Sequence, residues 1–141
     1  MRLKKTTTVI LITLMTLSFN VIANDLIFKC DIKNKKHVSL YKDLEYITYS
    51  FGKNNLPPDI ELKRKKEQLD INIGNPSGRY LTNSIEINNG VYSYRLTTSV
   101  DRIADEQIPK TSLTVMKDGK DLTSLDCIKG SEVGALIAID D

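Results

Sequence analysis

Apolar and polar residues alternate in short runs along most of the chain after residue 23, with the two-residue period of β-strands. Between Leu69 and Gly74, for example, Leu69, Ile71 and Ile73 fall on one face and polar residues on the other. Runs of this kind occupy 26–30, 37–41, 46–52, 69–74, 84–87, 91–99, 112–116 and 122–127. The pattern predicts an all-β fold, an antiparallel barrel or sandwich of about eight short strands.

Short segments rich in Asn, Asp and Gly separate several of these runs and predict hairpins. Asn88-Asn89-Gly90 and Asp118-Gly119 are the strongest signals, because these residue types tolerate the positive φ angles of tight turns. The lysine-rich segment 31–36 predicts a further hairpin, and prolines at positions 57 and 58 make 53–59 a loop. Most neighbouring strands are therefore expected to pair antiparallel.

Three segments allow more than one interpretation. Residues 60–70, "IELKRKKEQLD", fit either a charged edge strand or a short helix. Residues 100–110 are polar and loop-like, with room for one helical turn. The apolar tail 134–141 is expected to add an edge strand or to cover an open end of the core.

The first 23 residues have the features of a secretory signal peptide. Basic residues at positions 2, 4 and 5 precede the apolar run Val9–Ala23, whose last three residues suit a signal peptidase. That run is about 15 residues long, whereas a membrane-spanning helix needs roughly 20. We expect cleavage after Ala23, no membrane span afterwards, and a single β domain from residue 24 to 141 that is periplasmic or secreted.

Removal of this segment changes the charge balance of the chain. The full chain holds 20 basic and 18 acidic residues, and the segment 1–23 takes three of the basic ones and none of the acidic ones, which leaves a formal charge of −1. Nucleic-acid binding depends on neutralising many phosphates with basic side chains. A nearly neutral domain is therefore expected to bind no nucleic acid.

The two cysteines, Cys30 and Cys127, lie near opposite ends of the expected domain. In an oxidising compartment such a pair is normally joined in a disulfide. Metal ligation and a catalytic thiol are the alternatives, but His37 is the only histidine and there is no second cluster of cysteine and histidine. We expect a disulfide that ties the first strand to the last, and neither a metal nor another cofactor.

The sequence does not favour an enzyme. It contains no G-x-S-x-G nucleophile motif and no histidine-based metal motif. His37 follows a lysine-rich turn and is expected to face water, which makes a catalytic role the less favoured alternative. Carboxylates cluster at positions 101, 105 and 106 and again at 140 and 141, but without the spacing of a calcium site, so solvation is the preferred interpretation.

One run is strongly basic: Lys63, Arg64, Lys65 and Lys66. On an edge strand, such residues discourage pairing with the sheet of another molecule, and this is the favoured interpretation. As a binding patch, the same run would attract an anionic polymer of the cell envelope or an acidic protein. The sequence leaves this second interpretation open.

The segment 75–96, "NPSGRYLTNSIEINNGVYSYRL", combines turn residues with tyrosines and arginines. On its last strand, alternation places Tyr92, Tyr94 and Leu96 on one face, expected to be core, and Arg95 on the other. Tyrosine and arginine are enriched where proteins bind one another. The candidate partner-binding residues are the following: Ser77, Arg79, Tyr80 and Arg95.

At these positions the chain resembles the small periplasmic inhibitors of c-type lysozyme, which are compact antiparallel β-barrels. The shared features are Phe28-Lys29-Cys30, Ser77-Gly78-Arg79-Tyr80, Tyr92-Ser93-Tyr94-Arg95 and a late cysteine, Cys127. The resemblance implies that Ser77 and Arg95 enter the lysozyme cleft and contact its catalytic acids. The chain departs from the pattern in having no tryptophan. It also resembles other small secreted bacterial β proteins.

Together these features favour an exported bacterial protein that binds a protein partner and is not an enzyme. An inhibitor of a cell-wall hydrolase such as lysozyme is the leading hypothesis. An immunity protein against a toxin delivered into the periplasm is the main alternative, followed by an envelope accessory protein that binds an anionic polymer. The identity of the partner, the strand order and the oligomeric state do not follow from the sequence.

Overall fold

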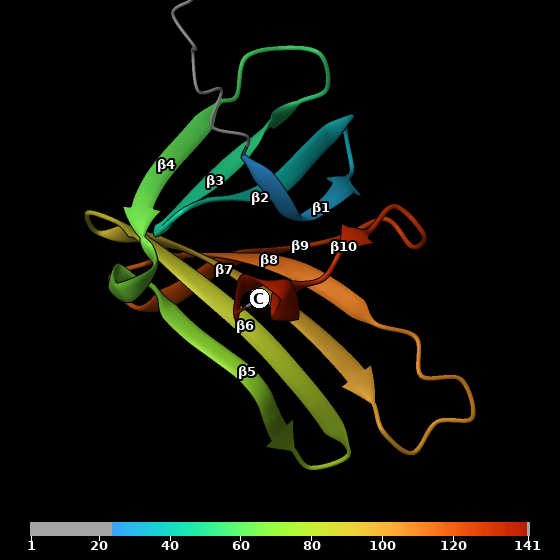
Figure 1. Cartoon of the computed structure of the whole chain (residues 1–141). Coiled ribbons are helices and arrows are strands. Elements are labelled where there is room, and N and C mark those ends of the chain that lie inside the picture. The colour runs from blue at the N-terminus through green and yellow to red at the C-terminus, as the bar shows by residue number, and fades with distance from the viewer. Residues whose placement is uncertain (1–23, 141) are drawn as a thin grey trace, which may run out of the picture.

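The computed structural model describes residues 24–140, so the expected signal peptide lies outside the described residues. Two five-stranded antiparallel sheets face each other (Figure 1). The first has the order β10 (Val133–Gly134), β1 (Asp25–Ile32), β2 (Lys36–Asp43), β3 (Tyr46–Lys53), β4 (Ile60–Lys65); the second has the order β5 (Asp70–Ser77), β6 (Tyr80–Asn89), β7 (Tyr92–Asp101), β8 (Lys110–Lys117), β9 (Lys120–Asp126). The predicted all-β fold is confirmed as a sandwich, because the two sheets do not close into a barrel.

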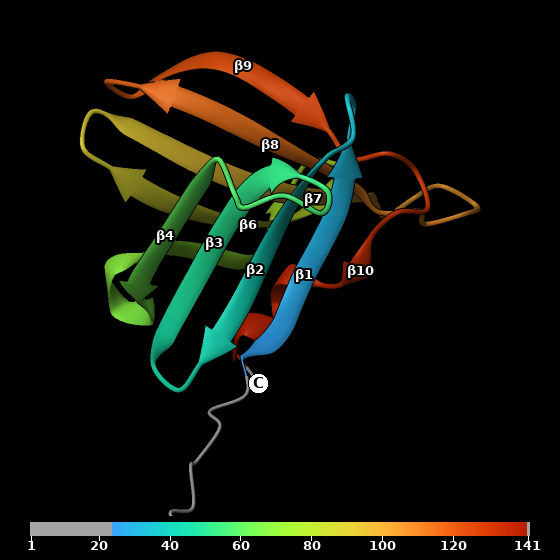
Figure 2. The ribbon, with the colours of Figure 1, turned by 90° about the horizontal axis from the view of Figure 1, so that it is seen from above.

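The strands of the two sheets run at a steep angle to each other when the molecule is seen from above (Figure 2). The only helices in the described part of the chain are two short 3₁₀ turns, η1 (Lys66–Gln68) and η2 (Leu136–Asp140). Neither is long and apolar enough to cross a membrane.

The predicted hairpins are present, with their turns defined by the strand register. Asn89 pairs with Tyr92, so the β6–β7 turn is centred on Gly90 and Val91, one residue later than the sequence suggests. Gly90 has a φ angle of 66°, a conformation that glycine adopts without steric cost. The β8–β9 turn is centred on Asp118 and Gly119, as predicted.

The segment 60–70 forms both of the structures that its sequence allowed. Ile60–Lys65 is β4, the edge strand of the first sheet, and the next three residues form η1. In the segment 100–110, residues 102–109 form a loop, while the first two residues belong to β7 and Lys110 begins β8.

The core lies between the sheets and is built from alternate residues of both. Tyr49 of β3 and Tyr94 of β7 stack across it, with ring centroids 5.3 Å apart. Leu96 is fully buried, as alternation predicts, but Tyr92 is 38% exposed and the expectation that it belongs to the core is wrong. Tyr92 is the first residue of β7, so it lies at the end of the sheet, where cover from the facing sheet is incomplete.

The predicted disulfide is present and joins the two sheets. Cys30 is in β1 of the first sheet and Cys127 directly follows β9 of the second, with Cα atoms 5.7 Å apart. Beside the bridge, the Ile128 N–H donates to the Asp31 carbonyl oxygen at 2.8 Å. A disulfide in a small all-β domain is compatible with a periplasmic or extracellular location.

The C-terminal tail both adds an edge strand and covers an open end of the core, the two alternatives that its sequence allowed. Val133 and Gly134 form β10, which pairs with β1 at the edge of the first sheet. The following turn η2 contacts β1 and β6, one strand from each sheet, and buries Leu136 and Ile139. The tail therefore covers one open side of the core.

Candidate functional site

The Ser77-Gly78 segment predicted as a contact surface is the two-residue turn between β5 and β6. Ser77 pairs with Tyr80, and Gly78 takes the positive φ angle of 58° that the turn requires. On the other side of β6, Tyr80 pairs with Asp101, the last residue of β7. The turn and the beginning of the loop after β7 therefore meet; we call residues 77–80 and 101–103 the β5–β6 corner.

Hydrogen bonds fix this corner from both sides. The Arg79 guanidinium donates to both carboxylate oxygens of Asp101, the Nε–Oδ1 distance being 3.0 Å. Arg102 donates its backbone N–H to the Arg79 carbonyl oxygen at 2.9 Å and its guanidinium to the Gly78 carbonyl oxygen. The Ile103 N–H in turn donates to Asp101 Oδ1 at 3.2 Å. The turn and the loop thus brace each other.

The ion pair also sets the electrostatics of the corner. Hydrogen bonds from the Arg79 guanidinium lower the pKa of Asp101 below its ordinary value, while the Asp101 carboxylate raises the pKa of Arg79. Both groups are therefore charged throughout the physiological pH range. A bidentate pair of this kind constrains orientation as well as distance.

The corner presents two large apolar side chains to solvent beside these charges. Tyr80 is 45% exposed and Ile103 is 70% exposed. The Arg79 guanidinium carbon lies 5.8 Å from the centre of the Tyr80 ring, within the range of a cation–π contact. Tyrosine and arginine are the residue types enriched among protein-binding anchors, and here they lie beside an exposed aliphatic side chain.

Arg95 does not belong to this corner. It pairs with Glu86 in the middle of the β6–β7 hairpin, and its Nε and Nη2 donate to Glu86 Oε2 at 2.9 and 2.7 Å. Glu86 is six residues beyond Tyr80 on β6, about 20 Å along the strand at about 3.3 Å per residue. The structure therefore brings Ser77, Arg79 and Tyr80 together and leaves Arg95 apart, paired with an acidic neighbour.

The basic run of β4 and η1 lies close to several acidic side chains. Nζ atoms of Lys63, Lys65 and Lys66 lie 2.9, 3.6 and 2.8 Å from carboxylates of Asp43, Glu45 and Asp140, respectively. Arg64 instead donates to the Asn88 carbonyl oxygen at 3.3 Å, which connects β4 to the end of β6 in the other sheet.

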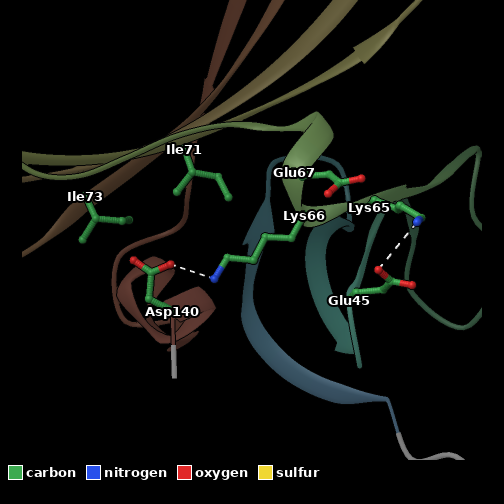
Figure 3. Close-up of a pocket in the computed structure, with 7 residues that line it drawn as sticks. All are labelled: Glu45, Lys65, Lys66, Glu67, Ile71, Ile73 and Asp140. Atoms are coloured by element: carbon green, nitrogen blue, oxygen red, sulfur yellow. Dashed lines mark ion pairs between the residues drawn. The ribbon is translucent and has the colours of Figure 1, made fainter.

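Lys65 and Lys66 line an open groove of about 630 Å³ (Figure 3). Its other walls are the acids Glu45, Glu67 and Asp140 and the isoleucines at positions 71 and 73 of β5. In Figure 3, Lys66 extends to Asp140 and Lys65 to Glu45. Acidic side chains therefore lie among these lysines around the groove.

His37 and the clusters of acidic side chains are the groups that could serve catalysis or bind a metal ion. His37 lies on β2 opposite Asp31 and Gly52. Its side chain, which we expected to face water, is half-buried, and its Nδ1 atom has no hydrogen-bond partner among residues 24–140. Within residues 24–140, no three side chains of His, Cys, Asp or Glu gather in a way that would hold a metal ion.

The sequence did not single out Arg102 and Ile103, and it placed Asp101 in a cluster of solvated carboxylates with no assigned partner. Strand register relates them, but the turn expected from the sequence lies one residue too early, and counting from it would place Tyr80 opposite Ser99. Counting back from the observed β6–β7 turn places Tyr80 opposite Asp101, since each step along β6 matches one step along β7 without a bulge. The same count places Arg95 opposite Glu86.

Comparisons with known proteins give no assignment. No protein-family model, curated protein or solved structure matches the chain.

Proposed function

We propose that this chain is an exported binding protein that contacts a protein partner through the β5–β6 corner, and that the partner is a cell-wall hydrolase of the c-type lysozyme class. It acts by occupying a site on the partner and not by catalysis. The observation that carries the proposal is the braced corner, in which Arg79 and Asp101 hold exposed Tyr80 and Ile103 in place.

Rigidity is what such a contact needs. Ordering a flexible loop on binding reduces affinity, whereas a surface that is already ordered avoids that loss. The hydrogen bonds between the two halves of the corner provide this order before any partner arrives. Tyr80 and Ile103 then supply apolar area that becomes buried on binding.

The hydrolase target follows from the resemblance at Ser77-Gly78-Arg79-Tyr80 and from the donors that the corner offers. A guanidinium has five N–H groups, of which Asp101 occupies those on Nε and Nη2, so others remain for a second carboxylate. The Ser77 hydroxyl has no hydrogen-bond partner among the described residues and is exposed. A cleft lined by catalytic acids accepts hydrogen bonds from both groups.

This geometry favours Ser77 with Arg79, rather than Ser77 with Arg95, as the pair that enters the cleft. Arg95 is about 20 Å from the turn along β6 and β7 and is already bound to Glu86. The resemblance implies a role for Arg95, so the two assignments make different predictions for single variants.

Lysis of peptidoglycan by a c-type lysozyme tests the proposal. Purified protein from residue 24 onward should slow lysis at micromolar concentration, and Ser77→Ala combined with Arg79→Ala should weaken the inhibition at least about tenfold, as the loss of interface anchors does. Arg95→Ala is the matched control and should leave the inhibition within about threefold of the unaltered protein. If no lysozyme class is inhibited, the hydrolase target is wrong.

An immunity protein remains the second candidate, because it would use the same kind of braced surface. Co-expression of the exported protein with a periplasm-targeted toxin encoded beside it distinguishes this function from lysozyme inhibition. Rescue of growth that is lost with Arg79→Ala and Tyr80→Ala would support immunity. The polymer-binding alternative has less support, because Lys63, Lys65 and Lys66 each lie within 4.0 Å of an acid.

A further inference from the structure

A second candidate site lies at the other end of β7 from the β5–β6 corner. There a cleft of about 360 Å³ opens between the sheets, with walls from β2, β3 and β4 on one side and β7, β8 and β9 on the other. This volume is within the range of pockets that hold small molecules. Tyr92 and Tyr94 at the start of β7 line the cleft, whereas the corner lies at Asp101, where β7 ends.

Aromatic side chains dominate this cleft. Tyr49, Phe51, Tyr92 and Tyr94 all line it, four of the nine tyrosines and phenylalanines in the chain. Tyr49 and Tyr94 stack with their ring planes 19° apart. Because the two rings stack on each other, they present only edges and outer faces to the cleft, and an aromatic ligand packs favourably against such surfaces in edge-to-face or offset geometry.

Burial increases from the rim of the cleft to its floor. Tyr92 at the rim is 38% exposed, and Lys36 lies there over the Phe51 ring while paired with Asp59 at 3.3 Å. At the floor, Tyr49 is 0% exposed and Leu113 is 1% exposed. The cleft thus has a dry apolar interior below a polar rim, which is the usual architecture of a small-molecule site.

The interior holds one polar group without a partner. The Tyr49 hydroxyl oxygen is buried and makes no hydrogen bond with any described residue. A buried hydroxyl without a partner is unfavourable, and structures usually provide one from protein, water or ligand. Burial also raises the pKa of Tyr49 well above its ordinary value, so the hydroxyl keeps its proton and is a hydrogen-bond donor.

We propose that this cleft binds a small, planar, apolar molecule that carries a carbonyl or similar acceptor for the Tyr49 hydroxyl, which a small displacement of the Tyr49–Tyr94 stack exposes. The aromatic walls favour a flat ring, and the scarcity of polar groups on the floor excludes a highly charged one. The site is independent of the proposed partner contact, because the two lie at opposite ends of β7 and share no residue.

A pair of nearly isosteric probes tests the hydrogen bond directly. 2-Acetylnaphthalene has the carbonyl acceptor and 2-ethylnaphthalene lacks it, so we expect the ketone to bind about threefold to tenfold more tightly, as one buried hydrogen bond implies. In Tyr49→Phe both probes should still bind, but with equal affinity. The measurement is an NMR titration that follows the amide signals of Leu113 and Val115, which line the cleft.

Blocking the cleft supplies a second test that does not depend on Tyr49. Val115→Phe adds a ring at a half-buried lining position and should abolish binding of both probes, with no saturation of the shifts. Val133→Phe is the matched control, because Val133 is 53% exposed on β10 and does not line the cleft. Binding of neither probe to the folded protein at their solubility limit, or a ketone preference that persists in Tyr49→Phe, would overturn the proposal.

Discussion

At the scale of single residues, the ion pair between Arg79 and Asp101 makes the β5–β6 corner sensitive to acid. Because the pKa of Asp101 is lower in the folded state, the ionised carboxylate stabilises the fold fully above the unfolded pKa of about 3.9. This stabilisation is lost as the pH falls through the lower pKa of the folded state. We predict that Arg79→Gln moves the Asp101 pKa upward, measured by carboxyl ¹³C NMR titration. Arg95→Gln should leave it unchanged, and an equal shift in both variants would contradict the assignment.

Tyr49 gives a second prediction at this scale, concerning stability. Because its hydroxyl is buried without a partner, Tyr49→Phe should leave the free energy of unfolding unchanged or raise it by about 1 kcal/mol. Tyr49→Ala should instead lower it by about 3–5 kcal/mol, since it removes a fully buried ring that stacks on Tyr94. Urea unfolding measures both. A loss of more than about 1 kcal/mol in Tyr49→Phe would reveal a hydrogen bond that the structure does not show.

At the scale of the elements, sequence alternation and turn chemistry predicted most strands and hairpins, because both are local properties. Ser77, Arg79 and Tyr80 could be proposed for the same reason, since a turn exposes its residues wherever it lies. The rest of the corner could not be found locally. Asp101 reaches Arg79 only through the register of the β6–β7 hairpin, and the exposure of Tyr92 depends on where the facing sheet ends.

Pairing of the short strand β10 with β1 depends on a glycine at position 134. Gly134 has a φ angle of 75°, and a Cβ atom added there would lie 2.1 Å from the Ile27 carbonyl oxygen. Gly130→Ala should cost only about 1–2 kcal/mol, because its φ angle is also positive at 82° but a Cβ atom meets nothing within 4 Å.

We predict that Gly134→Ala destabilises the protein by more than Gly130→Ala and separates β10 from β1. The Ala135 N–H, which donates to Ile27 O at 3.1 Å, should then exchange with solvent much faster. Hydrogen exchange at Ala135, together with urea unfolding of both variants, measures this. Equal losses of stability in the two variants would show that the clash at Ile27 is relieved by a small shift of β10.

At the scale of the whole molecule, the bond between Cys30 and Cys127 joins two sheets that also meet through side-chain packing and through the hydrogen bond from Arg64 to the Asn88 carbonyl oxygen. It spans 97 residues of sequence, so the chain-entropy model assigns it about 4–5 kcal/mol. We predict that Cys30→Ala combined with Cys127→Ala lowers the free energy of unfolding by nearly this amount in urea. A loss below about 1 kcal/mol would mean that packing and the Ile128–Asp31 hydrogen bond hold the sheets together without the bridge.

The same variant separates the stability of the sandwich from the geometry of its corner. The bonds that fix the corner run among β5, β6 and β7 within one sheet, and none of them crosses to the sheet that carries Cys30. In the folded fraction of the double cysteine variant, the pKa of Asp101 should therefore remain lowered, and any inhibition of lysozyme should persist in proportion to the folded protein. Loss of the lowered pKa while the sheets stay folded would show that the corner depends on the sandwich as a whole, and binding through it would then require the disulfide.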